Sequence, residues 1–137
     1  MISKIRTALG GNEAGKQIAV LGLTFKPQTD DMRDAPALSI LPKLIENGAK
    51  IRAHDPKGMQ EARPLLPDTV VFCNDIYETL KDADAVVLMT EWHEYRGMAL
   101  DKIRELMKGN VFVDLRNVYE PAIMRSKGFD YYCVGRK

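Results

Sequence analysis

Short apolar runs rich in β-branched residues alternate along this chain with stretches of helical spacing. Strands are predicted over Gln17–Leu23, Ala49–Asp55, Thr69–Cys73, Asp84–Thr90, Asn110–Leu115 and Phe129–Val134. The run Ala85–Met89 is apolar throughout, which is typical of a strand covered on both faces. The alternation predicts βαβ units, and therefore an α/β fold of three layers with a mostly parallel sheet of about six strands.

The segments between these runs carry helix signals. Asp34 is placed to cap a helix over Ala35–Asn47, and Gly48 supplies a left-handed residue to end it. Pro42 removes one backbone hydrogen bond inside this helix, so a kink or a short first segment is expected. Further helices are predicted over Ile76–Leu80 after its cap Asp75, over Leu100–Lys108 closed by Gly109, and over Met59–Leu66, which Pro64 and Pro67 interrupt.

The composition is that of one packed globular domain. The chain has 137 residues, of which 45% are hydrophobic and 28% charged. Its 20 basic and 19 acidic residues leave a net charge of +1, so no chain-wide field attracts a nucleic acid or a membrane. No apolar run approaches the roughly 18 residues of a membrane span, and Cys73 and Cys133 form no cluster of metal-binding spacing. A cytoplasmic protein with reduced cysteines and no metal is expected.

The first residues differ from the rest of the chain. Ile2, Ile5 and Leu9 have helical spacing, and a glycine pair at Gly10 and Gly11 ends the pattern before the first predicted strand. The apolar face of this helix needs a partner. We therefore expect a helix that leads into the domain, followed by the domain itself.

Loops at the carboxyl ends of parallel strands form the ligand crevice of such sheets. The loop over residues 22–36 has a single glycine, so it lacks the G-x-G-x-x-G fingerprint of a dinucleotide site. It offers instead the ammonium of Lys26 and the guanidinium of Arg33, two groups that bind phosphate or carboxylate. The alternative is that these cations pair with Asp30 and Asp31, which are expected to be turn and cap residues rather than metal ligands.

Other strand ends carry residues with two possible roles. Arg116 is either a crevice residue or a surface strand end, and Asp55 either binds a ribose or caps a turn. Trp92 either stacks on a ligand ring or packs in the core, while His54 and His93 are expected to be exposed histidines without a specific role. No nucleophile with a matching base is found, so the chain is expected to bind rather than react.

A resemblance to a known family begins in the loop after the first predicted strand. The sequence GLTFKPQTDDMRDAP over residues 22–36 resembles the C-terminal domain of the UDP-glucose/GDP-mannose dehydrogenase family, most closely the bacterial members that oxidise UDP-glucose. The resemblance continues, in order and at similar spacing, through Gly48–Pro56, Thr90–Trp92, Val113–Asn117 and Val134–Arg136. It covers about residue 16 to the end of the chain.

The resemblance implies a role in a larger enzyme. In that family the complete enzyme oxidises the C6 alcohol of the sugar to a carboxylate and reduces two NAD molecules. An N-terminal domain holds most of the NAD, a helical middle region supplies the catalytic cysteine, and a Rossmann-like C-terminal domain holds the nucleotide end of the substrate. Residues 1–15 would then be the tail of a linking helix from a missing middle domain, and residues 16–137 the nucleotide-sugar-binding domain. The chain alone is expected to be inactive, and the complete enzyme to be a homodimer.

The resemblance also assigns residues. It implies that Phe25, Lys26 and Arg116 contact the UDP-sugar and that Arg33 reaches NAD bound mainly by the other domain. No catalytic or metal-binding residue is expected in the chain. The three cations are expected at one edge of the sheet, to meet the roughly two negative charges of a diphosphate. Two alternatives stay open: a GDP-mannose dehydrogenase domain, and a non-catalytic α/β module that assembles with a partner through the Met1–Leu9 helix.

Overall fold

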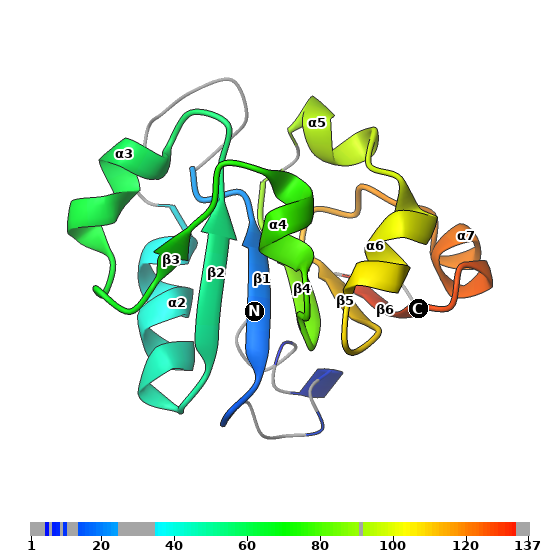
Figure 1. The fold of residues 1–137 in the computed structure, drawn as a ribbon, viewed down its shortest axis with the longest axis horizontal. Helices are drawn as coiled ribbons and strands as arrows, with labels where there is room; N and C mark the ends of the chain where they lie inside the picture. Colours follow the sequence, from blue (N-terminus) through cyan, green and yellow to red (C-terminus); the bar gives the residue numbers. More distant parts are fainter. Residues whose placement is uncertain are drawn as a thin grey trace.

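A parallel sheet forms the middle layer of the molecule. The computed structural model describes residue 5, residues 7–8, residue 10 and residues 14–24, 35–90 and 92–133. The strands are β1 (Gln17–Leu21), β2 (Lys50–His54), β3 (Val71–Phe72), β4 (Ala85–Leu88), β5 (Val111–Asp114) and β6 (Asp130–Cys133). They lie in the order β3-β2-β1-β4-β5-β6, and every neighbouring pair is parallel (Figure 1). The predicted α/β fold, Rossmann-like with about six strands, is confirmed.

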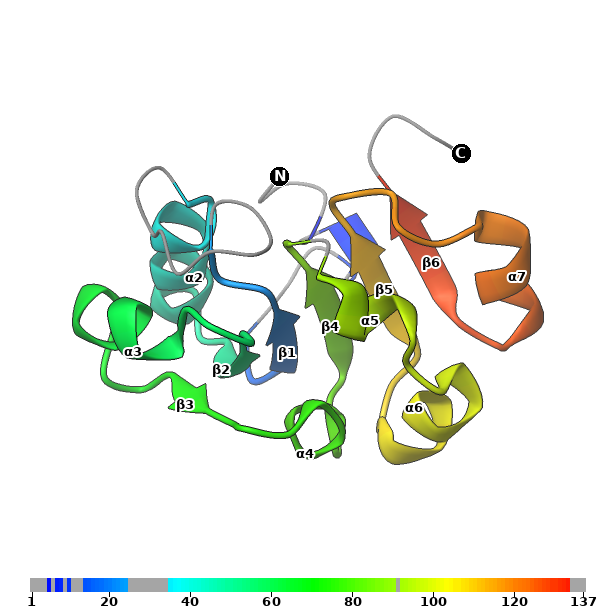
Figure 2. The ribbon, with the colours of Figure 1, turned by 90° about the horizontal axis from the view of Figure 1, so that it is seen from above.

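Helices cover both faces of the sheet (Figure 2). One face carries α2 (Ala37–Glu46), with α3 (Met59–Ala62) and the 3-10 turn η1 (Arg63–Leu65). The other face carries α4 (Ile76–Leu80), α5 (His93–Arg96), α6 (Leu100–Leu106) and α7 (Pro121–Ser126). The split follows from right-handed crossovers, because the chain runs from β1 to β2 in one direction across the sheet and from β4 to β5 in the other. None of the described helices is long and apolar enough to cross a membrane.

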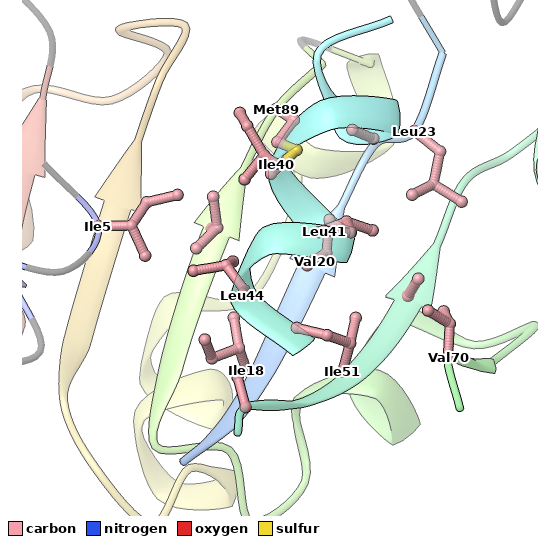
Figure 3. Close-up of a cluster of buried hydrophobic side chains, with 14 of the residues drawn as sticks. Ile5, Ile18, Val20, Leu23, Ile40, Leu41, Leu44, Ile51, Val70 and Met89 are labelled. Atoms are coloured by element: carbon pink, nitrogen blue, oxygen red, sulfur yellow. The ribbon is translucent and has the colours of Figure 1, made fainter. Parts of the chain in front are cut away.

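Alternating side chains of the strands build a core on each face. Ile18 and Val20 of β1 point toward α2, whereas Ala19 and Leu21 point toward the opposite helices. All four residues of β4 are buried, as the continuous apolar run predicted. Figure 3 shows the α2-side cluster, in which Leu41 and Leu44 face the strands.

The ends of α2 follow the predicted glycine stop but not the predicted cap. Gly48 has φ +99°, its N–H donates to the Ile45 carbonyl at 2.9 Å, and the next N–H donates to the Leu44 carbonyl at 3.0 Å. These two hydrogen bonds satisfy carbonyl groups of the last helical turn, which have no partner within the helix. The helix begins at Ala37 with Pro36 in the N-cap position, so it starts later than predicted, and Asp34 lies outside the described residues.

Helix α2 runs without interruption through Pro42, so of the two predicted outcomes, a kink or a short first segment, the short first segment is wrong. A proline inside a helix costs about 3 kcal/mol. Burial of an aliphatic side chain stabilises by about 1.5–3 kcal/mol, and Ile40, Leu41 and Leu44 are all buried. Packing against the sheet therefore outweighs the loss of one backbone hydrogen bond.

The remaining helices differ little from the helices that the sequence predicted. Asp75 caps α4 as predicted, since its carboxylate accepts the N–H of Glu78 at 3.0 Å. Helix α6 ends at Leu106, so Gly109 does not close it. Gly109 is instead a packing position, because a Cβ there would lie 2.3 Å from the Asp84 carbonyl oxygen.

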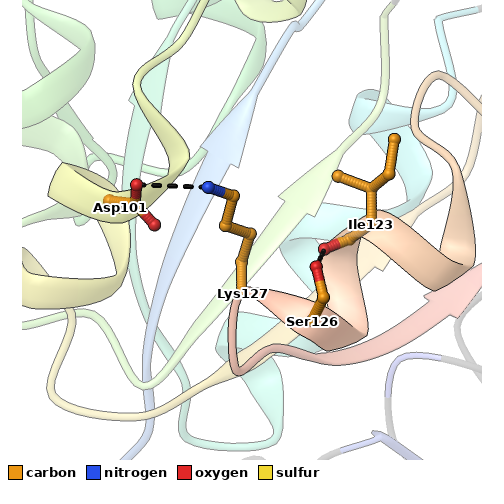
Figure 4. Close-up of polar contacts among 4 residues, drawn as sticks. All are labelled: Asp101, Ile123, Ser126 and Lys127. Atoms are coloured by element: carbon orange, nitrogen blue, oxygen red, sulfur yellow. Dashed lines mark hydrogen bonds and ion pairs between the residues drawn. The ribbon is translucent and has the colours of Figure 1, made fainter.

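The surface between α6 and α7 holds an exposed ion pair (Figure 4). Lys127 Nζ lies 3.2 Å from Asp101 Oδ2, and the Ser126 hydroxyl donates to the Ile123 carbonyl at 2.6 Å. Exposed pairs of this kind contribute at most about 1 kcal/mol. They lie on the exposed outer surface of this helical layer.

The described residues of the N-terminal segment are part of the core. Ile5, Thr7 and Ala8 have helical backbone, and Ile5 and Ala8 are buried in the α2-side cluster. Ile5 lies beside β5 in Figure 3. Since the crossovers after β4 and β5 place their helices on the opposite face, this segment covers a part of the sheet that α2 does not reach. The apolar face formed by Ile5 and Ala8 thus has its partner within the chain, which weakens the assembly-module alternative.

Candidate functional site

The carboxyl ends of β1, β2, β4 and β5 share one edge of the sheet, and the strand order reverses between β1 and β4. Ligands of such sheets bind in the crevice at this reversal. Neighbouring strands lie about 4.8 Å apart, so the ends of β1 and β5, with β4 between them, are about 10 Å apart. Loops from these strands can therefore contact one small ligand. We call this region the carboxyl edge.

The structure describes only part of the predicted ligand-binding set. Arg116 is half-buried in the loop that follows β5. Phe25, Lys26 and Arg33 lie outside the described residues. Thr24 directly precedes Phe25 in the chain, so the loop that carries these residues leaves the sheet at the same edge as Arg116. That Lys26, Arg33 and Arg116 lie together at this edge of the sheet stays a prediction.

Gly22 brings the loops after β1 and β4 into direct contact. It has φ +94°, and a Cβ at this position would lie 2.5 Å from Thr90 Cβ. The Thr90 hydroxyl donates to the Thr24 carbonyl at 2.8 Å, and the Gly22 N–H donates to the His54 carbonyl at 2.8 Å. Only glycine fits this conformation at this distance. The single glycine of the loop is therefore needed for close backbone packing at the strand reversal.

Asp55 fastens the loops after β1 and β2 to each other. Its carboxylate is fully buried, and Oδ2 accepts the backbone N–H groups of Leu23 and Thr24 at 2.7 and 3.1 Å. Oδ1 accepts the N–H groups of Lys57 and Gly58 at 2.9 and 2.6 Å. The turn-capping alternative for Asp55 is confirmed.

These contacts bear on whether NAD fits this domain. A dinucleotide in the crevice of such a fold needs a glycine-rich turn after the first strand and an accessible carboxylate for the ribose. The loop after β1 has one glycine, and the Asp55 carboxylate is buried and bonded to the chain's own backbone. The described residues therefore do not fit NAD in the β1–β2 crevice of this domain.

Asp114 organises the loop that carries Arg116. It is fully buried at the end of β5, and its Oδ1 accepts the Arg116 N–H at 3.0 Å. Its Oδ2 accepts the N–H groups of Val118 and Tyr119 at 2.7 and 3.0 Å, and the Tyr131 hydroxyl donates to Oδ2 at 2.7 Å. The sequence reasoning missed this role. An aspartate at a strand end, with loop N–H groups two to five residues later, is the signal that points to it.

His54 and Tyr95 form a buried pair beside this edge, so the prediction of an exposed His54 is wrong. His54 Nδ1 lies 2.9 Å from the Tyr95 hydroxyl oxygen, and that hydroxyl donates to the His54 carbonyl at 3.0 Å. Because a hydroxyl has one proton, Nδ1 carries the imidazole proton and donates to Tyr95. Burial lowers the pKa of His54, against the opposing effect of the nearby carboxylates of Asp55, Glu94 and Asp75. Burial also raises the pKa of Tyr95.

Trp92 and the two cysteines are buried in the core. Trp92 is 1% exposed within the core on the α6 side, so the packing alternative is confirmed. Cys73 and Cys133 are buried, and no disulfide joins them. Among the described residues, no group of three histidine, cysteine or acidic side chains could hold a metal ion. The side chain of His93 lies outside the described set.

Two cavities open at the opposite, amino edge of the sheet. One has a volume of about 400 Å³ and is lined by residues that include Ile45, Lys50 and Thr69. The other has a volume of about 280 Å³ and is lined by residues that include Lys16 and Asn110. Neither contains a residue of the predicted site.

Comparisons with known proteins agree on one family. Residues 19–121 match the UDP-glucose/GDP-mannose dehydrogenase family, UDP binding domain. The UDP-glucose 6-dehydrogenase of Rhizobium meliloti (strain 1021) is 44% identical over 133 residues, which are 97% of this chain and 30% of that protein. UDP-glucose 6-dehydrogenase TuaD of Bacillus subtilis (strain 168) is 39% identical over 136 residues, which are 99% of this chain and 29% of that protein.

A solved structure gives the same result in three dimensions. The UDP-glucose dehydrogenase from the hyperthermophilic archaeon Pyrobaculum islandicum has a TM-score of 0.75 and 31% identity, over 96% of this chain and 28% of that chain. The chain therefore spans less than a third of the length of the relatives it matches.

Proposed function

This chain belongs to the UDP-glucose/GDP-mannose dehydrogenase family, and from that premise we propose that it holds the nucleotide end of UDP-glucose in an NAD-dependent UDP-glucose 6-dehydrogenase. The complete enzyme of this proposal oxidises UDP-glucose to UDP-glucuronate. The catalytic cysteine and most of the NAD site belong to other regions of that enzyme. This domain binds and orients the substrate and is inactive alone.

One observation carries the proposal: the loops that bear Arg116 and lead to Phe25 and Lys26 leave the sheet at the same edge, one strand apart. A diphosphate presents about two negative charges over a few ångströms, which suits one planar guanidinium and one compact ammonium. The guanidinium of Arg116 gives a forked contact to phosphate oxygens, and Lys26 gives a point charge. Phe25 supplies an apolar surface for the nucleotide sugar.

The proposal limits the contact with NAD to Arg33. Since the β1–β2 crevice does not fit a dinucleotide, NAD is held by another domain and Arg33 reaches toward it from this one. The proposed partners are thus a UDP-sugar and the dinucleotide-binding and cysteine-bearing regions of the same enzyme, as a cytoplasmic homodimer.

Calorimetric titration of the chain with UDP tests the proposal. We expect saturable binding, and we expect Lys26→Ala and Arg116→Ala each to weaken it by about tenfold or more, since a hydrogen bond to a charged group contributes about 1.5–3 kcal/mol. Lys50→Ala is the matched control, because Lys50 is an exposed cation at the amino edge of β2. Competition with GDP distinguishes the GDP-mannose alternative. Absence of heat at millimolar UDP, or equal losses in all three variants, would overturn the proposal.

A further inference from the structure

Hydrogen bonds join the two loops of the proposed site across the strands between them. From the β5 side, the Asp114 carboxylate accepts the N–H of Tyr119, and the Tyr119 hydroxyl donates to the Tyr95 carbonyl. From there the Tyr95 hydroxyl donates to the His54 carbonyl at 3.0 Å. The chain of contacts thus runs from β5, through the helix after β4, to β2.

The same path continues into the loop after β1. The His54 carbonyl also accepts the N–H of Gly22 at 2.8 Å. The next two N–H groups, of Leu23 and Thr24, are held by the Asp55 carboxylate. Thr24 immediately precedes the predicted ligand residues Phe25 and Lys26. One polar path, partly buried at Tyr119 and buried from Tyr95 onward, therefore connects the Arg116 loop to the Lys26 loop.

On the Arg116 side, this path begins at the Asp114 carboxylate, which holds the turn after β5. Its two oxygens accept three backbone N–H groups of residues 116–119, so the carboxylate fixes the turn from within. Asn117, inside that turn, has φ +55°, a left-handed conformation that asparagine adopts more readily than most residues. The Tyr131 hydroxyl, donating to Oδ2 at 2.7 Å from β6, holds the carboxylate in turn. The backbone at Arg116 is thereby set in place before any ligand arrives.

We propose that Asp114 is a positioning residue for nucleotide diphosphate binding, acting through Arg116. This inference rests on the proposed function. A ligand contact made by a pre-arranged arginine avoids the entropy loss of ordering that side chain on binding. Without the carboxylate, the three N–H groups of the turn lose their shared acceptor. Arg116 must then be ordered when the ligand binds, which lowers the affinity for the ligand.

A double-mutant cycle on the 137-residue chain tests the inference, with UDP affinity measured by NMR titration. We expect Asp114→Asn to weaken UDP binding about tenfold, as for loss of hydrogen bonds that hold a charged contact. In an Arg116→Ala background the same change should alter the affinity by less than about twofold, because residues that act as a unit are not additive. Asp84→Asn is the matched control: its carboxylate accepts the Gln17 N–H at 2.8 Å at the amino edge, and its loss should leave the affinity unchanged.

A second variant covers the case in which Asp114→Asn does not fold. Tyr131→Phe removes only the hydroxyl that holds the Asp114 carboxylate, and we expect about threefold weaker UDP binding, again only when Arg116 is present. Equal effects with and without Arg116 would assign Asp114 to stability alone and overturn the inference. If the unaltered chain fails to bind UDP, the proposed function itself is wrong, a result that is distinct from additivity in a chain that binds.

Discussion

Replacement of Asp55 by alanine should destabilise the fold more than its place in a loop suggests, because its carboxylate is fully buried. The change removes the acceptors for four backbone N–H groups, those of Leu23, Thr24, Lys57 and Gly58. Three of the four belong to buried residues, all except Lys57. A buried donor left without a partner costs about 1–3 kcal/mol.

The expected loss for Asp55→Ala is therefore about 3–6 kcal/mol, with allowance for relaxation of the loops. Against a total stability of about 5–15 kcal/mol for a domain, this is a large fraction. With a urea slope near 2 kcal/mol per molar, the unfolding midpoint should fall by about 2 M.

Urea unfolding followed by circular dichroism measures this shift. Asp84→Ala serves as the matched control, because it removes the acceptor of one N–H group, that of Gln17, and should cost about 1 kcal/mol. A midpoint for Asp55→Ala no lower than that of the control would refute the assignment of Asp55 as the clamp between the two loops.

Three further predictions follow from the geometry. Gly22→Ala should lower the free energy of unfolding by at least about 2 kcal/mol, because φ +94° and the approach to Thr90 both exclude a Cβ; an unchanged urea midpoint would contradict this. Burial holds the pKa of His54 below 6.5, so His54 takes up a proton at higher pH in the unfolded chain than in the folded one, and the free energy of unfolding falls as the pH drops from 7 to 5. His54→Asn should make this fall smaller. An identical dependence of stability on pH in the variant and the unaltered chain would contradict this prediction. Ile5→Ala should lower the free energy of unfolding by about 2–5 kcal/mol. Leu65→Ala, at a 54% exposed position, should lower it by less than about 0.5 kcal/mol. Equal decreases in melting temperature for the two variants would contradict the assignment of Ile5 to the core.

The sequence predicts the layers of the fold well because strand and helix periodicities differ. The apolar run Ala85–Met89 marks a central strand from local composition alone. Helices α5 and α7 have four and six residues, too few for the apolar spacing of a helix to stand out. Pro121 at the first position of α7 is a local signal of a helix start that the sequence prediction did not use.

The site is less predictable because its contacts join distant segments. His54 is buried by Tyr95, 41 residues away, in a helix that the sequence reasoning did not find. Asp114 depends on Tyr131 from the next strand, and Asp55 on loop donors 31 and 32 residues earlier. Residue types at strand ends indicate where a ligand site can form, but the hydrogen-bond partners of each carboxylate can be known only from the packed sheet.

Mapping of backbone amide resonances during titration with UDP tests the central claim most directly. The account predicts that the shifts concentrate on residues that follow β1, β4 and β5, including Thr24, Thr90 and Arg116. Shifts confined to the amino-edge cavity around Ile45 and Thr69, with the carboxyl edge unaffected, would contradict it.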